Sequence, residues 1–279
     1  MHVEATTRGA GVPVLVLHGS PGGIDAARVM SRFLPEDTFR SVLVSRPGYL
    51  GTPLDPAHAS IDDEADLLAG VLDGLGIDRV GVLAWSGGGP AAYRLAARHP
   101  DRVHAVVAAS AVSGAWAPAR PHPAEYVVSH TAVGARVSGW LAAHAPRATV
   151  LGAMSGVSSL RGRALRDHVS DVLADPDQRA FMLDVAATGN TSGRHRTGWS
   201  NDVRTLGAIT SLGLEEVRAP VLLVHGDADT EVLPVHSTRA ASELPDAELV
   251  MLPGGTHFAF WDHRDAAAVQ ARARAHLTP

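Results

Sequence analysis

The segment VGVLAWSGGGP, residues 80–90, is a short apolar run that passes directly into a serine and three glycines. The run predicts a buried strand, and Pro90 is typical of the first turn of a helix. A sharp turn between strand and helix holds the intervening side chain exposed and needs small neighbours, because the backbone is crowded there. Ser86 occupies that position, and the glycines at 87–89 supply the room. Ser86 is therefore a candidate nucleophile, with simple capping of the helix as the alternative.

The same order of elements recurs on both sides of this segment. Further apolar runs that end in turns lie at residues 14–17, 41–44, 103–109, 221–224 and 249–252. Stretches of helical length lie between them, at residues 61–75, 90–98, 237–243 and 265–276. Continuous apolar runs without polar alternation indicate strands that are covered on both faces. The chain is therefore expected to have an α/β fold with a doubly wound, mostly parallel sheet.

Residues 113–213 depart from this pattern. No convincing strand is found there, and proline residues separate helical stretches at 125–144, 161–173, 177–186 and 201–212. The sheet pattern resumes at Val221, so this segment is predicted to be an all-helical cap inserted into a core of residues 1–112 and 214–279. A second, independent helical domain is the alternative.

The composition excludes several functional classes. The chain has 279 residues, of which 46% are hydrophobic, so it can bury a large core. Its net charge of −5 leaves no basic surface for nucleic acid or anionic lipid, so neither partner is expected. It has no cysteine, which excludes thiolate nucleophiles and disulfides. It contains neither G-x-G-x-x-G nor H-E-x-x-H, so no cofactor and no metal are expected.

The N-terminal residues Met1–Ala5 are neither basic nor apolar enough for a signal peptide. The longest apolar stretch, residues 105–117, is too short to cross a bilayer. A cytoplasmic location is therefore expected. No feature of the sequence indicates an oligomeric state.

Two further segments place ionisable residues directly after apolar runs. They are HGDAD at residues 225–229 and GGTHF at residues 254–258. Side chains at the carboxyl ends of parallel strands converge on the crevice where such sheets bind ligands. In chain order, the candidate nucleophile, an aspartate and His257 form a possible catalytic triad. Each residue alone is equally typical of a turn, and either Asp227 or Asp229 fits the order.

Together these motifs resemble the α/β-hydrolase fold family. The resemblance covers residues 13–110 and 219–276. It rests on HGSPG at 18–22, WSGGGP at 85–90, HGDAD at 225–229 and GTHF at 255–258. Ala84 stands where the family pattern G-x-S-x-G has its first glycine, and alanine is the smallest replacement.

The resemblance implies roles for individual residues. Ser86 would be the nucleophile, His257 the general base and Asp229, in preference to Asp227, the acid that orients the base. The backbone N–H groups of Ser20 and Gly87 would form the oxyanion hole. His18 is expected to brace the loop that carries Ser20, and residues 46–51 to support that loop.

The implied reaction is acyl transfer to water, with a small-molecule ester, lactone or related acyl compound as the substrate. A proline-releasing aminopeptidase and a C–C bond hydrolase are alternatives within the family. A non-catalytic receptor for a small ligand is the alternative from another class. A halide-displacing enzyme is not expected, because it would carry aspartate at position 86.

The cap segment is expected to determine the substrate. Aromatic residues that could line its pocket or form its core are Trp116, Tyr126, Trp140, Phe181 and Trp199. Acids that could hold a substrate amine are Glu125, Asp171 and Asp184. The arginines at 161, 163 and 166 are expected to lie on a solvated helix face, with an anion site as the alternative.

Overall fold

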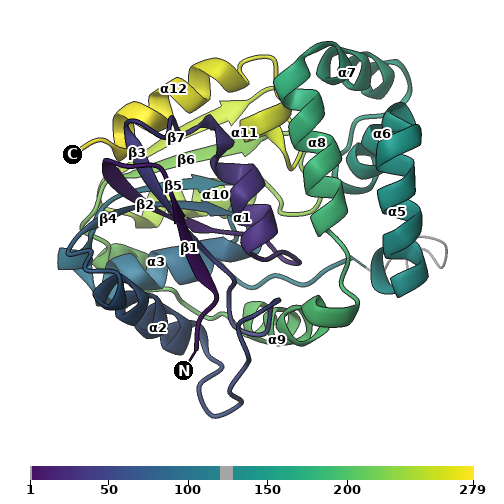
Figure 1. Cartoon of the computed structure of the whole chain (residues 1–279). Coiled ribbons are helices and arrows are strands. Elements are labelled where there is room, and N and C mark those ends of the chain that lie inside the picture. The colour runs from purple at the N-terminus through teal and green to yellow at the C-terminus, as the bar shows by residue number, and fades with distance from the viewer. Residues whose placement is uncertain (1, 120–127) are drawn as a thin grey trace.

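The computed structural model describes residues 2–119 and 128–279 (Figure 1). One seven-stranded sheet lies at its centre, with the strand order β1-β3-β2-β4-β5-β6-β7. The strands are β1 (Ala5–Arg8), β2 (Val12–Leu17), β3 (Phe39–Val44), β4 (Val80–Trp85), β5 (Val103–Ala109), β6 (Val221–Gly226) and β7 (Ala247–Leu252). β1 pairs antiparallel with β3, and every other pairing in the sheet is parallel.

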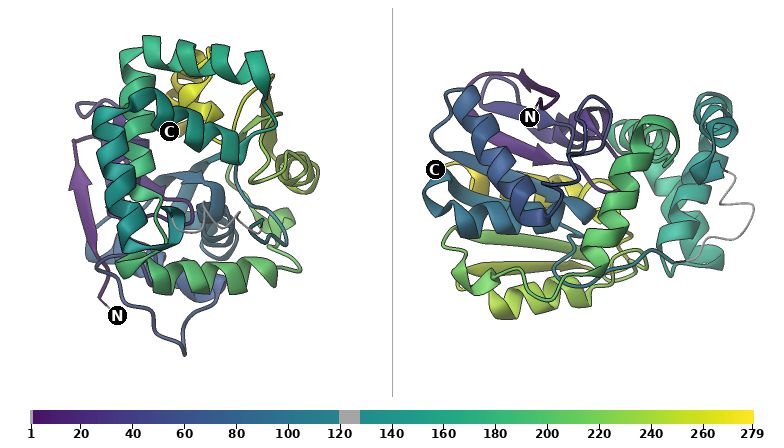
Figure 2. Two further views of the ribbon diagram at one scale, coloured as in Figure 1. Left: turned by 90° about the vertical axis from the view of Figure 1, so that its right-hand side faces the viewer. Right: turned by 90° about the horizontal axis from the view of Figure 1, so that it is seen from below.

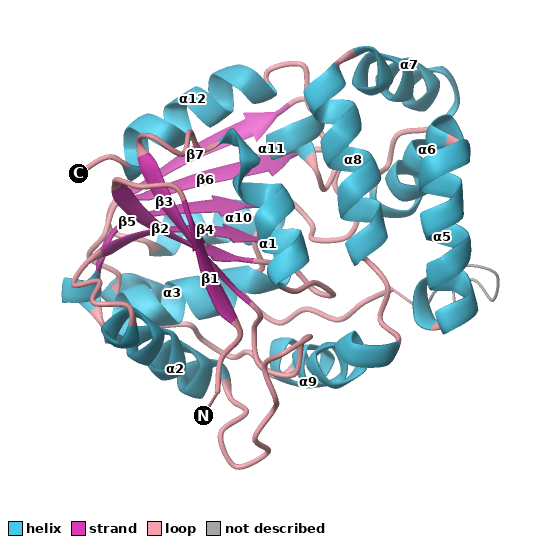
Figure 3. Ribbon diagram, in the orientation of Figure 1, coloured by secondary structure: helices cyan, strands magenta, loops and turns pink. Residues whose placement is uncertain are grey.

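Helices cover both faces of the sheet (Figure 3). They are α1 (Ile24–Met30), α2 (Ile61–Gly74), α3 (Gly89–Arg98), α5 (Ala132–His144), α6 (Pro146–Val157), α7 (Gly162–Ala174), α8 (Pro176–Thr188), α9 (Arg196–Gly207), α10 (Val235–Glu243), α11 (Ala259–Asp262) and α12 (Ala266–Leu277). α2, α3 and α10 contribute to one buried apolar cluster, and α1 and α12 contribute to the other. The predicted doubly wound, mostly parallel α/β sheet is confirmed.

β2 shows why the strands read as continuous apolar runs. Successive side chains of a strand point to opposite faces of the sheet. Leu15 and Leu17 belong to the cluster under α2 and α3, whereas Val14 and Val16 belong to the cluster under α1 and α12. Both faces of the sheet are covered by helices and shielded from water, so the residues that point to either face are apolar.

Two helices begin on signals that can be read in the sequence. Ser60 caps α2: its hydroxyl accepts a hydrogen bond from the Asp63 backbone N–H, and the Asp63 carboxylate accepts one from the Ser60 N–H. This reciprocal arrangement satisfies two backbone donors at the start of the helix. α3 begins at Gly89 with Pro90 in its first turn.

The described part of residues 113–213 is helical. α5 to α8 lie beyond the carboxyl ends of the strands, and α9 runs alongside the core (Figures 1 and 2). α6 was not predicted, and α9 ends at Gly207 although the sequence suggested a helix to residue 212. The β-branched pair Ile209 and Thr210 follows Gly207 and does not favour helix. The first three residues of the predicted helical stretch 125–144, residues 125–127, lie outside the described residues.

One backbone contact joins this helical segment to the loop after β6. Ser158, directly after α6, forms an isolated antiparallel bridge with Asp229. The flanking N–H of Ser159 donates to the carbonyl of Ala228 at 2.7 Å, and the Thr230 N–H donates to Val157 at 3.1 Å. The end of α6 therefore supports the backbone of the loop that carries Asp229.

A search of residues 2–119 and 128–279 for membrane-spanning helices found none with the required length and apolar character.

Candidate active site

Ser86 lies at the turn between β4 and α3, in the conformation that the sequence predicts. Its backbone φ is +54°, a value that non-glycine residues seldom adopt. A Cβ on Gly87 would lie 3.0 Å from the Cβ of Ser20, and one on Gly88 would lie 2.6 Å from the carbonyl oxygen of Leu17. The turn therefore presses against the end of β2 and the loop that follows it. Ala84 is buried within the sheet and does not prevent the turn.

Asp229 and His257 form a buried acid–base pair. Nδ1 of His257 lies 2.7 Å from Oδ2 of Asp229. The other oxygen, Oδ1, accepts hydrogen bonds from the backbone N–H groups of Glu231 at 2.8 Å and Val232 at 3.1 Å. The carboxylate is therefore held in place from both sides. Of the two aspartates predicted from the sequence, it is Asp229 that contacts His257.

Asp227 lies elsewhere in the same loop. It is exposed, and its Oδ1 accepts a hydrogen bond from the N–H of Gly254 at 2.6 Å. It therefore fastens the loop after β6 to the loop after β7.

The charges of the pair support one another. Burial raises the pKa of Asp229, but His257 and the hydrogen bonds from two histidines outweigh it, so the pKa lies well below its ordinary value. Burial lowers the pKa of His257, but the attraction of Asp229 outweighs it, so the pKa lies above its ordinary value. Asp229 is therefore ionised at neutral pH and stabilises the protonated imidazole.

His257 is also held through its backbone. The indole N–H of Trp85 donates to the His257 carbonyl at 3.2 Å, and the two rings lie 5.3 Å apart. Trp85 precedes Ser86, so one indole connects the turn after β4 to the loop after β7. Within the described residues no hydrogen bond joins the Ser86 hydroxyl to His257, but both side chains line one cavity. Contacts of this kind often tighten only when substrate is bound.

Ser20 lies against the turn that carries Ser86. A Cβ on Gly87 would lie 3.4 Å from the backbone nitrogen of Ser20, and a Cβ on Gly19 would lie 3.0 Å from the Cβ of Ser86. The loop after β2 and the turn after β4 are therefore in van der Waals contact. The two amides expected to bind an oxyanion belong to adjacent segments.

His18 and Arg46 fix the loop that carries Ser20. His18 is fully buried; its Nε2 accepts from the Arg46 backbone N–H at 3.0 Å, and its Nδ1 lies 2.7 Å from the carbonyl of Gly19. Burial and the nearby Arg46 lower the pKa of His18 well below its ordinary value, so the ring is neutral. The bracing hydrogen bonds predicted for His18 are confirmed.

A buried ionic network extends from this loop to α9. The Arg46 guanidinium makes two 3.0 Å bonds to Asp202, and its Nε donates to Glu64 at 2.7 Å. Asp202 also accepts hydrogen bonds from the hydroxyls of Tyr49, at 2.6 Å, and Ser20. The sequence did not indicate Asp202, because a single aspartate in a helix carries no motif. The network joins α9 to the loop that carries Ser20 and to α2.

Replacing Asp202 by alanine is expected to destabilise the protein by about 3–5 kcal/mol, because Arg46 would remain buried with one of its two carboxylates missing. Urea unfolding of the variant and of the parent chain measures this difference. Glu243→Gln is the control, because it breaks the exposed pair with Arg239 and is expected to cost at most about 0.5 kcal/mol. Equal losses in the two variants would contradict the prediction.

A cavity of about 790 Å³ lies between the sheet and the helical segment. Ser20, Ser86 and His257 line it from the core. Small residues of α6, including Gly152, face it from the other side, and Trp199 of α9 closes part of its wall. A cavity of this size and mainly apolar lining is suited to a small organic ligand.

The other aromatic residues predicted for the cap pack against neighbouring rings or are exposed to solvent. Trp116 packs edge-on against Trp199 at 6.3 Å, and Phe181 stacks on Trp261 at 4.8 Å. Trp140 is 59% exposed. Tyr126 and Glu125 lie outside the described residues.

The predicted charged groups that the structure describes in residues 128–213 do not line the cavity. Asp171 is exposed, and Asp184 pairs with Arg32 at 2.6 Å. The three arginines at 161, 163 and 166 are exposed, as predicted for a solvated helix face, and none lines the cavity.

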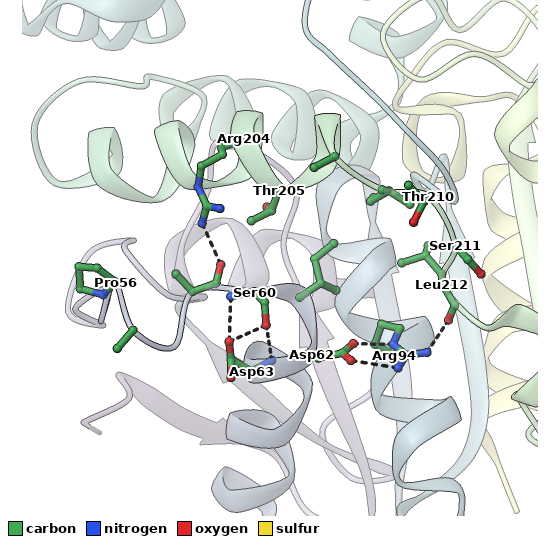
Figure 4. Close-up of a pocket in the computed structure, with 15 residues that line it drawn as sticks. Pro56, Ser60, Asp62, Asp63, Arg94, Arg204, Thr205, Thr210, Ser211 and Leu212 are labelled. Atoms are coloured by element: carbon green, nitrogen blue, oxygen red, sulfur yellow. Dashed lines mark hydrogen bonds and ion pairs between the residues drawn. The ribbon is translucent and has the colours of Figure 1, made fainter.

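A second cavity, of about 500 Å³, lies between the start of α2 and the end of α9 (Figure 4). Its charged groups satisfy one another: Arg94 pairs with Asp62 at 2.6 Å, and Arg204 donates to the carbonyl of Ala59 at 3.3 Å. The Asp63 carboxylate is engaged in the cap of α2. Among the described residues that line this cavity there is no histidine to act as a base for its serine and threonine hydroxyls, so the candidate site is the cavity at Ser86.

Two ionisable residues close to the pair were not singled out from the sequence. His225 is fully buried; its Nε2 lies 3.2 Å from Oδ2 of Asp229, and its Nδ1 bonds the hydroxyl of Ser237 at 2.7 Å. Glu231 lines the cavity, two residues after Asp229.

A search of the described residues found no group of three or more histidine or acidic side chains arranged to hold a metal ion.

Comparison with known proteins agrees with the fold. Residues 12–264 match the family model for the alpha/beta hydrolase fold. An alpha/beta hydrolase fold protein from Nakamurella multipartita is 44% identical, with a TM-score of 0.96 over 99% of this chain and 95% of that one.

Two curated relatives have named activities. A pimeloyl-[acyl-carrier protein] methyl ester esterase from Aromatoleum aromaticum is 26% identical over 92% of this chain and 95% of its own length. A 2-hydroxy-6-oxononadienedioate/2-hydroxy-6-oxononatrienedioate hydrolase from Cupriavidus pinatubonensis is 28% identical over 95% of this chain and 87% of its own length.

Proposed function

Because the chain belongs to the alpha/beta hydrolase fold family and is a hydrolase of that fold, we propose that it cleaves a small-molecule ester, lactone or related acyl bond through Ser86. The observation that carries the proposal is the convergence on one cavity of Ser86, on its positive-φ turn, and of His257, held by Asp229. A cytoplasmic location and a small-molecule substrate remain predictions.

In the proposed first step, His257 accepts the proton of the Ser86 hydroxyl while the Ser86 oxygen attacks the substrate carbonyl carbon. The carbonyl electron pair moves to oxygen, and the backbone N–H groups of Ser20 and Gly87 stabilise that charge. One such donor is worth about 3–4 kcal/mol at a transition state. Asp229 keeps Nδ1 of His257 protonated, so that Nε2 is free to act as the base.

The tetrahedral intermediate then loses the alcohol. His257 gives its proton to the departing oxygen, which leaves Ser86 acylated. Water attacks the acyl group with His257 again as the base, and the second intermediate releases the acid and restores the Ser86 hydroxyl. No metal or cofactor takes part in the proposed cycle.

A fluorophosphonate probe tests the proposal directly. The expected result is a single adduct on Ser86, located by mass spectrometry of the digested protein, together with turnover in a screen of small esters and lactones. Unfolded protein is the control, because labelling of an activated serine requires the folded site. A folded protein that gives no adduct and no turnover would favour the non-catalytic receptor.

The aminopeptidase alternative receives less support. It needs acidic groups in the cap to hold a substrate amine, and of the cap acids that the structure describes, Asp171 and Asp184, neither lines the cavity; Glu231, which does line it, belongs to the loop after β6. The experiment that decides it is the inclusion of proline amides in the same screen, with no turnover expected.

The activity is expected to fall at acidic pH. His257 must be neutral to accept the Ser86 proton, and Asp229 raises the pKa of His257 above the ordinary imidazole value of about 6.5 in spite of burial. Activity is therefore lost as the pH drops through a pKa higher than that value. The pH dependence of kcat/KM on a neutral ester measures this loss of activity at acidic pH. An apparent pKa below 6.5 would contradict the assignment of His257 as the base.

A further inference from the structure

Glu231 has a carboxyl group that the proposed mechanism does not use. Its backbone is fixed at both ends, because its N–H donates to Asp229 at 2.8 Å and its carbonyl accepts from the indole of Trp116 at 2.8 Å. Its side chain lines the cavity that contains Ser86 and His257. Within residues 2–119 and 128–279 this carboxyl has no hydrogen bond and no ion pair. Glu231 is therefore a half-buried acid in the cavity of the candidate base, and its carboxyl group has no partner among the residues that the structure describes.

The charges around the cavity are one-sided. Of the described residues that line it, Glu231 is the only acid, none is an arginine, and His130 and His257 are the histidines. The chain contains no lysine. Burying a carboxylate is costly unless a cation or several hydrogen bonds compensate it. A substrate carboxylate in this cavity would instead face the carboxyl group of Glu231.

Glu231 and His257 line the same cavity, and both bond Asp229, Glu231 through its backbone N–H and His257 through Nδ1. Glu231 is one of the groups that raise the pKa of His257, after Asp229. Burial and Asp229 in turn raise the pKa of Glu231, whereas His257 lowers it. A charge that acts on the base also acts on a substrate bound there.

We propose that Glu231 determines the charge of the substrate: the cavity accepts neutral or cationic acyl compounds and rejects those that carry a carboxylate. The inference rests on the proposed function. It separates this chain from the Cupriavidus pinatubonensis relative, whose name gives a dioate substrate. Unfavourable placement of like charges is a common means of excluding a competing ligand.

Matched esters test the proposal. The first set varies the group at the far end of the acyl chain. Methyl hexanoate is neutral there, monomethyl adipate carries a carboxylate, and methyl 6-aminohexanoate carries an ammonium group. A second set, the hexanoyl esters of propanol, 3-hydroxypropanoate and choline, places the charge on the alcohol. Each kcat/KM is measured at about pH 8, where the carboxylates and ammonium groups are ionised. For each variant, kcat/KM of the anionic and of the cationic ester is divided by kcat/KM of the neutral ester of the same set, which gives an anionic ratio and a cationic ratio.

For the parent protein the anionic ester is expected to react at least about tenfold more slowly than the neutral ester in at least one set. Glu231→Gln keeps the shape of the side chain and removes its charge. In this variant the anionic ratio is expected to rise, and the cationic ratio to fall, by about tenfold each. A structural role would move all three esters together, and division by the neutral rate also removes any change in the base.

Glu215→Gln is the control, because Glu215 is an exposed acid that does not line the cavity, and both ratios should stay as in the parent. Glu231→Ala should repeat the effect of Glu231→Gln. If both ratios of both sets are the same in the parent and in Glu231→Gln, the inference is overturned. Failure of the proposed function would look different: no ester would react, and Ser86 would not be labelled.

Discussion

Ser86→Ala is expected to lower kcat on the best ester from the screen by at least about 10⁴-fold. Without the hydroxyl, no acyl-enzyme forms and His257 has no proton to accept, so only the binding of substrate beside the Ser20 and Gly87 amides remains. Single-turnover rates on a chromogenic ester measure the loss. KM is expected to change little, because the cavity keeps its walls.

A matched control is available in the neighbouring strand. Ser110 directly follows β5, is buried and has a positive φ of +43°, as Ser86 does after β4, but it does not line the cavity. Ser110→Ala is therefore expected to retain activity within about tenfold of the parent. Normal turnover by folded Ser86→Ala would remove Ser86 from the role of nucleophile.

The sheet could be predicted wherever a strand is buried on both faces. β2 to β7 carry apolar residues at successive positions and were found within a few residues of their bounds. β1 was missed because its sequence, Ala5-Thr6-Thr7-Arg8, is polar and half exposed. An edge strand that pairs on one side needs no continuous apolar run. α1 was missed for a related reason, since its seven residues are too few to show a helical period.

The candidate site was predictable where function depends on a local motif. The turn at Ser86 and the post-strand positions of Asp229 and His257 follow from sequence order. The contact between Asp202 and Arg46 does not, because 156 residues separate them and only the packing of α9 brings them together. Glu231 was overlooked because nothing in its neighbourhood shows that its side chain faces the cavity. Such groups become visible only once the fold is known.

The identity of the acid is the second prediction with a large effect. Asp229→Asn is expected to lower kcat by about 10⁴-fold, close to the loss in Ser86→Ala. Oδ1 of Asp229 accepts two backbone N–H groups, so an asparagine would keep its oxygen there and turn its NH₂ group toward Nδ1 of His257. Nδ1 would then accept a hydrogen bond, the ring proton would move to Nε2, and the nitrogen that should take the Ser86 proton would already carry one.

Asp227→Asn separates this effect from a general loss of negative charge in the same loop. The Asp227 carboxylate accepts from the Gly254 N–H, a bond that the oxygen of asparagine also makes, and it does not contact His257. Its kcat is therefore expected to stay within about tenfold of the parent. The two variants remove the same charge two residues apart, so the ratio of their rates reports the contact with the imidazole. A larger loss in Asp227→Asn than in Asp229→Asn would assign the orienting role to Asp227, and it would mean that the 2.7 Å pair of Asp229 and His257 is not the one used in catalysis.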